Sequence, residues 1–302
     1  MTRRLAPALA AAMAALIAAG GAPGVSAQGA GVATQGDRPI EVYADQGIEW
    51  DQKAQRYVAR GNAKAIQGDT TVYADTLTAH YEEAEGRGTE IVRIEATGGV
   101  RIVSANQTAY GGKGVYDMRK GVLVLTGGNL RLVTRTEIIT ARDSLEFHEK
   151  RNLAVARGNA VARPAPKAEG RDGGRGDRTV RADMLAATFR GEGRKDAAAG
   201  GEGRRLERMD AFGNVVVTRP GETARGAQGA YFPDRDIANL WGKVRITRGD
   251  NQFNGEQAEV NFRTGISRIL ADRDSPVRAL IQPEEKGDEP GEKRINSGER
   301  KN

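Results

Sequence analysis

The sequence predicts an all-β fold in which repeated antiparallel strands stack in a solenoid-like manner. Three observations lead to this prediction. Glycine accounts for 40 of the 302 residues, roughly twice the ~7% average, which favours tight turns and bulges over a helical bundle. A glycine-containing pair recurs along the chain, and between its copies apolar and polar residues alternate with a period of two.

The first repeated element is a Gly-Asn pair, replaced by Gly-Gly or Gly-Lys in single copies, that precedes an apolar-x-apolar triplet. Glycine in such a pair suits a bulge or turn that requires positive φ, and the triplet then begins a strand. The spacing is about 30 residues with one interrupted copy. The copies begin at Gly61, Gly98, Gly128, Gly158, Gly213 and Gly242.

The second repeated element follows most of these pairs by about a dozen residues and alternates strictly, as in Asp75, Leu77, Ala79 and Tyr81. This alternation is typical of a strand with one apolar face. Each repeat is therefore predicted to contain two or three short strands, with no helix after the N-terminal segment. The domain built from them is expected to span residues 38–272.

The N-terminus has the layout of a secretory signal peptide. Arg3 and Arg4 precede an apolar run over residues 5–19, and Val25-Ser26-Ala27 supplies a cleavage triplet. We expect residues 1–27 to be removed and the remaining chain to be exported to the periplasm. The alternative, an uncleaved membrane anchor, is disfavoured because the apolar run is shorter than the ~20 residues a spanning helix needs.

Three segments depart from the repeat pattern. Residues 164–178 and 191–205 are Gly-rich and charged, and we expect them to be polar inserts that loop out between strands. Residues 273–302 are rich in Pro, Glu and Lys and are expected to form a disordered tail, apart from a short segment at residues 277–281.

Composition argues against several kinds of chemistry. Cysteine is absent, which excludes disulfides and thiolate chemistry, and His80 and His148 are the only histidines, so no metal site is predicted. The net charge of +6 comes without a dense basic block, so nucleic acid is not expected as a partner. Four basic residues each stand between the two apolar members of a triplet and should face outward, because successive side chains of a strand point to opposite faces. They are Lys64, Arg101, Arg131 and Arg245.

Four aspartates could suggest a pair of catalytic carboxylates, as in glycosidases. They are Asp45, Asp75, Asp143 and Asp183. Because they recur with the repeat, a structural role in every unit is favoured over a catalytic pair, which is needed once. Trp50 and Trp241 lie near the two ends of the repeat region and are expected to cover the core.

Several segments resemble the OstA-like (LptA/OstA) family of lipopolysaccharide-transport proteins. The resemblance is carried by residues 38–45 (RPIEVYAD), 57–63 (YVARGNA) and 72–77 (VYADTL), and by the later Gly-Asn-Val and Ala-Asp-x-Leu copies. It extends over roughly residues 38–270. It implies a β-jellyroll folded like a taco, whose apolar groove holds the acyl chains of lipopolysaccharide, with no enzymatic activity and no cofactor.

Under this resemblance the inward-facing apolar residues would line the lipid groove. The partners implied are lipopolysaccharide and inner- and outer-membrane transport proteins of the same fold, with head-to-tail self-association through terminal strands. The groove residues expected are Leu77, Ala79, Val100, Ile102, Leu130, Leu132, Leu145, Phe147, Leu185, Val215, Val217, Val244 and Ile246.

The function expected is that of a periplasmic bridge that carries lipopolysaccharide from the inner to the outer membrane. Two alternatives stay open. One is an exported β-helical enzyme or adhesin acting on polysaccharide, and the other is the membrane-anchored partner of the same transport system. On pattern alone, aliphatic residues that alternate in this way more often fill a closed core than line an open groove.

Overall fold

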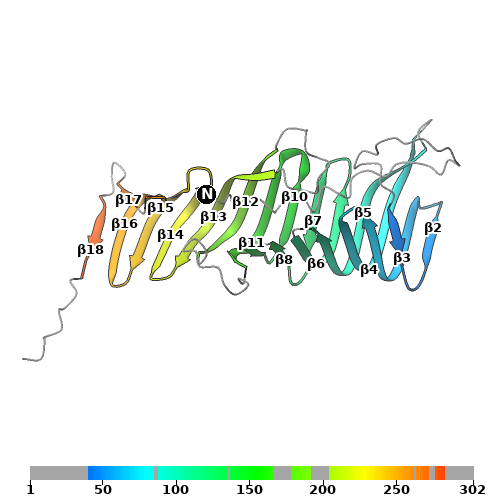
Figure 1. Cartoon of the computed structure of the whole chain (residues 1–302), viewed down its shortest axis with the longest axis horizontal. Helices are drawn as coiled ribbons and strands as arrows, with labels where there is room; N and C mark the ends of the chain where they lie inside the picture. The colour runs from blue at the N-terminus through cyan, green and yellow to red at the C-terminus, as the bar shows by residue number, and fades with distance from the viewer. Residues whose placement is uncertain are drawn as a thin grey trace, which may run out of the picture.

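A computed structural model describes residues 40–84, 88–105, 107–134, 137–165, 178–191, 204–261, 263–264, 266–271 and 276–282. In these residues the chain forms one sheet of 18 strands with exclusively antiparallel pairings. The molecule is elongated, and its strands run across the long axis from β2 at one end to β18 at the other (Figure 1). The all-β prediction is confirmed.

The long strands follow one another as hairpins, whereas short consecutive strands such as β7 and β8 pair side by side with the same long strand. The one helical element among the described residues is the 3-10 turn η3 (Glu149–Arg151). No described helix is long and apolar enough to pass through a bilayer. The strands are β1 (Glu41–Tyr43), β2 (Ile48–Asp51), β3 (Arg56–Gln67), β4 (Thr70–Ala84), β5 (Gly88–Ser104), β6 (Gln107–Asp117), β7 (Val122–Thr126), β8 (Arg131–Thr134), β9 (Glu137–Thr140), β10 (Ser144–His148), β11 (Leu153–Pro164), β12 (Thr179–Gly191), β13 (Arg204–Arg219), β14 (Glu222–Phe232), β15 (Ile237–Arg248), β16 (Asn251–Asn261), β17 (Ile266–Leu270) and β18 (Arg278–Leu280).

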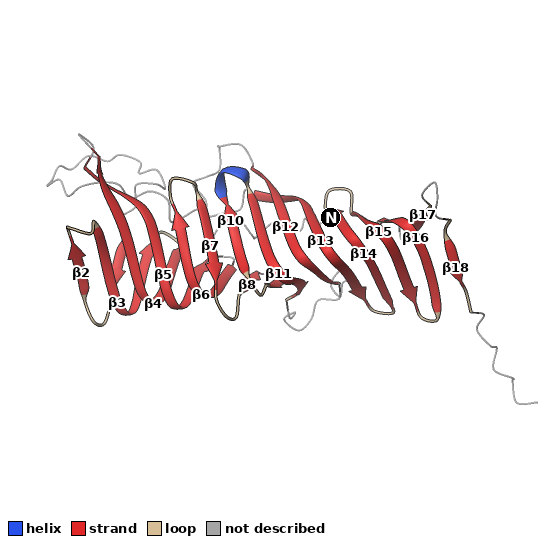
Figure 2. Cartoon of the chain, turned by 180° about the vertical axis from the view of Figure 1, so that it is seen from behind, coloured by secondary structure: helices blue, strands red, loops and turns tan. Residues whose placement is uncertain are grey.

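The long strands belong to two arms of the sheet that meet along a crease. For example, β3 pairs with β2 on one side of Gly61-Asn62 and with β1 on the other side. We call the side that carries β2, β7, β10 and β17 arm 1, and the side that carries β1, β8, β9 and β18 arm 2. Figure 2 shows the long strands crossing the whole width of the molecule, with the short ones beside them.

The crease is built by the recurring glycine pairs. The register shifts at this point in successive strand pairs, for example between Phe212 and Val215 where β13 meets β14. Gly213 has a φ of 75° and Asn214 a φ of 49°, so two consecutive residues adopt the left-handed conformation that Gly tolerates and that Asn populates more readily than most residues. The glycine pairs thus form a line of β-bulges that bends every other long strand, namely β3, β5, β11, β13 and β15, whereas the copy at Gly128 lies between β7 and β8.

The core lies between the two arms and forms one continuous cluster of small and medium aliphatic side chains. In arm 1 an inner row alternates small and large residues, as in Ala59, Leu77 and Ala96, which are directly paired across β3, β4 and β5. Such alternation lets the facing arms interdigitate without large aromatic residues.

The predicted domain boundaries fall as follows in the structure. The predicted insert at 164–178 overlaps the end of β11 at Pro164, and the one at 191–205 overlaps β12 at Gly191 and β13 at Arg204 and Arg205. Their interiors, 166–177 and 192–203, lie outside the described residues. The signal peptide at 1–27 also lies outside them. Within the tail at 273–302, β18 pairs with β16, and residues 283–302 are not described.

Candidate functional site

The space between the two arms is lined by an apolar row that runs the full length of arm 2. Each member is paired with the next, so the row passes through every strand of arm 2 without a polar interruption. In order from β1 to β18 it consists of Val42, Ala65, Val72, Ile102, Ala109, Leu132, Ile139, Ala162, Val180, Val217, Ala224, Ile246, Phe253 and Ala279.

All thirteen residues predicted from the sequence for this space lie on the inner face. Arm 1 contributes Leu77, Ala79, Leu145, Phe147 and Leu185, and arm 2 contributes Val100, Ile102, Leu130, Leu132, Val215, Val217, Val244 and Ile246. Ala79 and Val217 are half-buried, and the other eleven are buried. The interior is therefore largely closed, and its role in holding lipid remains a prediction.

A small cavity interrupts this packing midway along the molecule. Its volume is about 50 Å³, and it lies between Leu132 and Ile139 of arm 2 and Leu145, Leu185 and Met209 of arm 1. Alanines make up much of the remaining wall, namely Ala109, Ala154, Ala156, Ala162 and Ala187. The void exists because these short side chains face each other where larger ones would meet, and its wall is almost entirely apolar.

Farther from the crease, the inner face of arm 2 becomes polar. Gln67, Thr70, Gln107 and Thr134 are buried there. Beside them, burial raises the pKa of the Glu137 carboxyl, and the nearby Arg178 only partly offsets this effect. These side chains form a polar border to the apolar interior that the alternation pattern did not predict, because each one occupies an inward position normally taken by an apolar residue.

Across the same border, a cation that immediately precedes β12 contacts arm 1. The guanidinium of Arg178 lies over the ring of Tyr231 in β14, 4.5 Å from its centroid. Burial raises the pKa of Tyr231, and its hydroxyl donates a hydrogen bond to Asp236 at 3.0 Å. Sequence reasoning missed Glu137, Arg178 and Tyr231, since Arg178 falls at the edge of an insert and is far from Tyr231 in the chain.

The four recurring aspartates lie at the crease. Asn214 donates a hydrogen bond from Nδ2 to Asp183 at 2.9 Å, and Asn62 does the same to Asp45 at 2.8 Å. Asp75 and Asp143 pack against the bulge glycines Gly98 and Gly158, so closely that a Cβ on either glycine would overlap the carboxylate. The structural role expected for the aspartates is confirmed.

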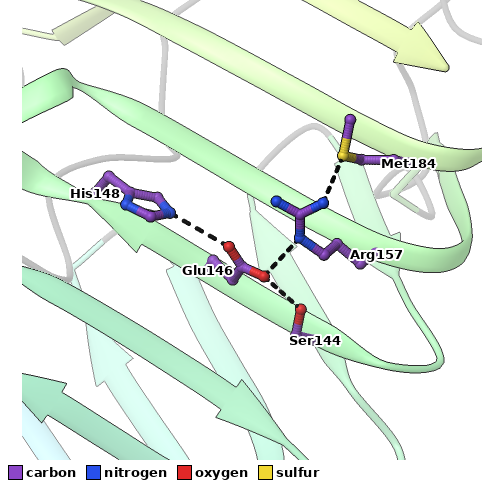
Figure 3. Close-up of polar contacts among 5 residues, drawn as sticks. All are labelled: Ser144, Glu146, His148, Arg157 and Met184. Atoms are coloured by element: carbon purple, nitrogen blue, oxygen red, sulfur yellow. Dashed lines mark hydrogen bonds and ion pairs between the residues drawn. The ribbon is translucent and has the colours of Figure 1, made fainter.

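A serine, a glutamate and a histidine do come together on the outer face of arm 1 (Figure 3). Glu146 accepts hydrogen bonds from Ser144 Oγ at 2.8 Å and Arg157 Nε at 2.7 Å, and His148 Nε2 lies 3.3 Å from its other oxygen. The carboxylate thus lies between the serine and the histidine. A nucleophile needs direct contact with its base, and in this cluster the serine hydroxyl is directed at the carboxylate instead.

The electrostatics of this cluster favour a charged carboxylate. Partial burial alone would raise the pKa of Glu146, but the hydrogen bonds from Ser144, Arg157 and His148 outweigh it and lower that pKa. Arg157 also contacts the sulfur of Met184 at 2.9 Å (Figure 3). The geometry is that of an ion-pair network linking β10, β11 and β12.

The two tryptophans differ from each other in position. Trp50 lies on the inner face at the β2 end, stacked on Tyr57 at 5.9 Å and donating to Tyr81 at 2.8 Å, although it is 57% exposed. Trp241 was expected to cover the core, but it follows the buried Leu240 and therefore faces outward, so that expectation was wrong.

The outward orientation expected for Lys64, Arg101, Arg131 and Arg245 is confirmed by the inward position of their neighbours.

A family model and a curated protein both match parts of this chain. A family model described as "LptA/(LptD N-terminal domain) LPS transport protein" matches residues 41–152 and 173–266. An uncharacterized protein of Rhizobium meliloti, R00383, is 32% identical over 101 residues, covering 32% of this chain and 54% of that protein. The chain thus spans about half the length of this curated relative.

Among solved structures, the chain is similar to LptH of Pseudomonas aeruginosa, described as the LptA-homologous periplasmic component of the lipopolysaccharide transport device. The identity is 14%, the TM-score is 0.20, and the match covers 82% of this chain and 96% of that one. The match to the family model covers more than half of the chain, and membership of the family rests on it.

Proposed function

Because the chain belongs to the LptA/LptD N-terminal domain family of lipopolysaccharide transport proteins, we propose that it is a periplasmic bridge that carries lipopolysaccharide toward the outer membrane. The observation that supports this proposal is the unbroken apolar row of arm 2, which extends from β1 to β18. The family is one of transport proteins, and no enzymatic activity is proposed.

The apolar row fits acyl-chain transport for an energetic reason. Each CH₂ moved from water to an apolar surface gains about 0.8 kcal/mol, so a lipid with several acyl chains needs continuous shielding to cross an aqueous space. Aliphatic side chains present a nearly uniform surface along the row. A chain sliding along it would change its free energy little from one strand to the next.

In the part of the chain that the structure describes, most inward side chains of the two arms are buried against each other, so lipid entry requires the arms to separate. The cavity beside Leu132 is the natural starting point, because less packing has to be broken where Ala109 and Ala162 leave space. The polar border at Gln107 and Thr134 would then meet the sugar and phosphate groups that remain outside the apolar interior.

The two ends of the sheet support end-to-end assembly. The terminal strands carry exposed apolar side chains, and each of these strands pairs on one side only among the described residues: Val42, Ile48 and Trp50 lie at one end, and Ile266, Leu270 and Leu280 at the other. Strand pairing between such edges would extend the apolar rows from one molecule into the next. Head-to-tail self-association or joining to partners of the same fold is therefore part of the proposal, and sedimentation velocity at increasing concentration tests it.

Photo-crosslinking tests the transport path directly. A photoreactive side chain at Leu132, which faces the interior, should label lipopolysaccharide in the periplasm, whereas one at the neighbouring Arg131, which faces outward, should not. Equal labelling at both positions, or none at Leu132 in folded protein supplied with lipid, would refute a lipid path between the arms.

The membrane-anchored partner of the same system is the alternative. It would require that residues 1–27 are retained, although the apolar run at residues 5–19 is shorter than the ~20 residues a spanning helix needs. Intact mass of the exported protein separates the two candidates. A mass that corresponds to a chain beginning at Gln28 supports the bridge, and retention of residues 1–27 supports the anchored partner.

A further inference from the structure

The outer face of arm 2 carries a ladder of alternating tyrosines and cations near the β1 end. Its members are directly paired across six neighbouring strands, which spans about 24 Å at the usual strand spacing. In order from β1 to β8 the ladder, called here the Tyr/cation ladder, consists of Tyr43, Lys64, Tyr73, Arg101, Tyr110 and Arg131.

The cations of the ladder are held by the rings beside them. The guanidinium of Arg101 lies 3.9 Å from the centroid of the Tyr73 ring, and that of Arg131 lies 4.4 Å from the Tyr110 ring. Lys64 Nζ is 5.6 Å from the Tyr43 ring. Cation–π contact keeps each charge close to the sheet without neutralising it.

The charges of the ladder differ from those on the outer face of arm 1. On arm 1, cations pair with carboxylates, as Arg93 does with Glu95 at 2.9 Å and Arg157 with Glu146 at 2.7 Å. Across the described ranges, Lys64, Arg101 and Arg131 form no ion pair with a carboxylate. The acidic side chains beside the ladder are Glu41, which bonds the Tyr43 hydroxyl, and the crease aspartates Asp45 and Asp75.

A second row follows the ladder on its side away from the crease. This aliphatic row has three half-buried members, each two residues after a ladder cation and on the same face of the sheet: Ile66, Val103 and Val133. They alternate across the strands with Thr71 and Thr108. The surface therefore combines cations, tyrosines and β-branched aliphatic residues, the composition found where proteins meet the membrane–water interface.

From this combination we propose that the Tyr/cation ladder and its aliphatic row dock on the anionic headgroup surface of a phospholipid bilayer. The three cations meet lipid phosphates, while tyrosine rings and aliphatic side chains rest at the headgroup boundary. A single-stranded nucleic acid fits less well, because base stacking needs open ring faces and the Arg side chains cover those of Tyr73 and Tyr110. The surface lies on the opposite side of the sheet from the apolar row, so it does not depend on the lipopolysaccharide path.

Binding to vesicles tests the proposal, using protein recovered from the periplasm and vesicles without lipopolysaccharide. Wild-type protein should co-sediment with phosphatidylglycerol vesicles and not with phosphatidylcholine vesicles. The variant K64Q/R101Q/R131Q should lose about fivefold in partitioning per cation, or roughly a hundredfold in total. R101K/R131K keeps the charges and should retain binding.

The matched control is R181Q/R225Q/R245Q, which removes three charges from the same face where the next row is threonine. These control cations begin three strands beyond Arg131, about 14 Å away, in a part of the face that lacks the tyrosines and the aliphatic row, so binding should fall much less than in K64Q/R101Q/R131Q. Equal losses in both triple variants, equal binding to neutral vesicles, or tighter binding to a single-stranded oligonucleotide than to vesicles would overturn the proposal.

Discussion

Filling the central cavity should stabilise the empty protein and hinder the proposed lipid path at the same time. Ala162 lines the cavity from β11, is 5% exposed, and is paired with Ile139 and Val180. The substitution Ala162→Val places two methyl groups in a void of about 50 Å³ without a propensity penalty, because valine favours strands.

The magnitude follows from the area that these methyl groups bury. At about 0.8 kcal/mol per buried CH₂ the gain is at most ~1.6 kcal/mol, and imperfect fit reduces it to about 1 kcal/mol. For a domain of this size that corresponds to a rise in Tm of roughly 2–4 °C. A chain in the lipid path would meet a narrower space, so crosslinking of lipopolysaccharide from Leu132 should fall.

The assay pairs thermal unfolding with the crosslinking measurement. Thr179→Val, on the outward face of the neighbouring β12, is the control and should change neither quantity appreciably. A lower Tm for Ala162→Val would mean that the cavity cannot accept the methyl groups. A higher Tm with undiminished labelling from Leu132 would refute the idea that lipid enters at the cavity.

Two further predictions concern the crease and the ionisable groups. Asn214→Ala should lower the free energy of unfolding, measured by denaturant titration, by about 1–2 kcal/mol, because alanine resists a φ of 49° and the 2.9 Å hydrogen bond to Asp183 is lost. Asn214→Gly accepts that φ and should lower the free energy of unfolding clearly less. Equal losses in the two variants would contradict the backbone explanation. Glu146→Gln should lower Tm at pH 7 and Glu137→Gln should raise it, since hydrogen bonds lower the pKa of Glu146 while burial raises that of Glu137. The stabilisation by Glu146 is present above its ordinary pKa of 4.5 and lost as the pH falls through its lowered value. Glu137 becomes protonated as the pH falls through its raised pKa, which removes the cost of keeping its charge buried. The difference in Tm between the wild type and each variant should therefore shrink in acid. A Tm difference that persists in acid would indicate that the substitution acts through packing.

The sequence predicted the fold well because every unit repeats the same local chemistry. Gly213 and Asn214 signal a bulge, and Val215 and Val217 signal the inner face beyond it, with no information needed from distant segments. The number of arms could not be predicted from the same pattern, since alternation says which side chains share a face and not that the sheet bends back on itself.

The parts of the site that escaped prediction depend on contacts between units. Arg178 reaches Tyr231 across the two arms, and Gln107 and Thr134 are buried by neighbours that local alternation does not reveal. Trp241 was misplaced because its size suggested the core, while its register with Gln228 and Gln257 puts it on the outer face. In each case the deciding information is which strands lie side by side.

The crease also makes the length of this molecule adjustable. Each pair of long strands carries its own bulge and contacts only the pairs on either side, as in other quasi-one-dimensional proteins. Duplicating one such unit of about 30 residues would lengthen the rod by two strand spacings, about 9.6 Å, and leave its cross-section unchanged. Duplication or deletion of single hairpins would therefore change the length of the molecule in fixed steps and fit it to a wider or narrower compartment.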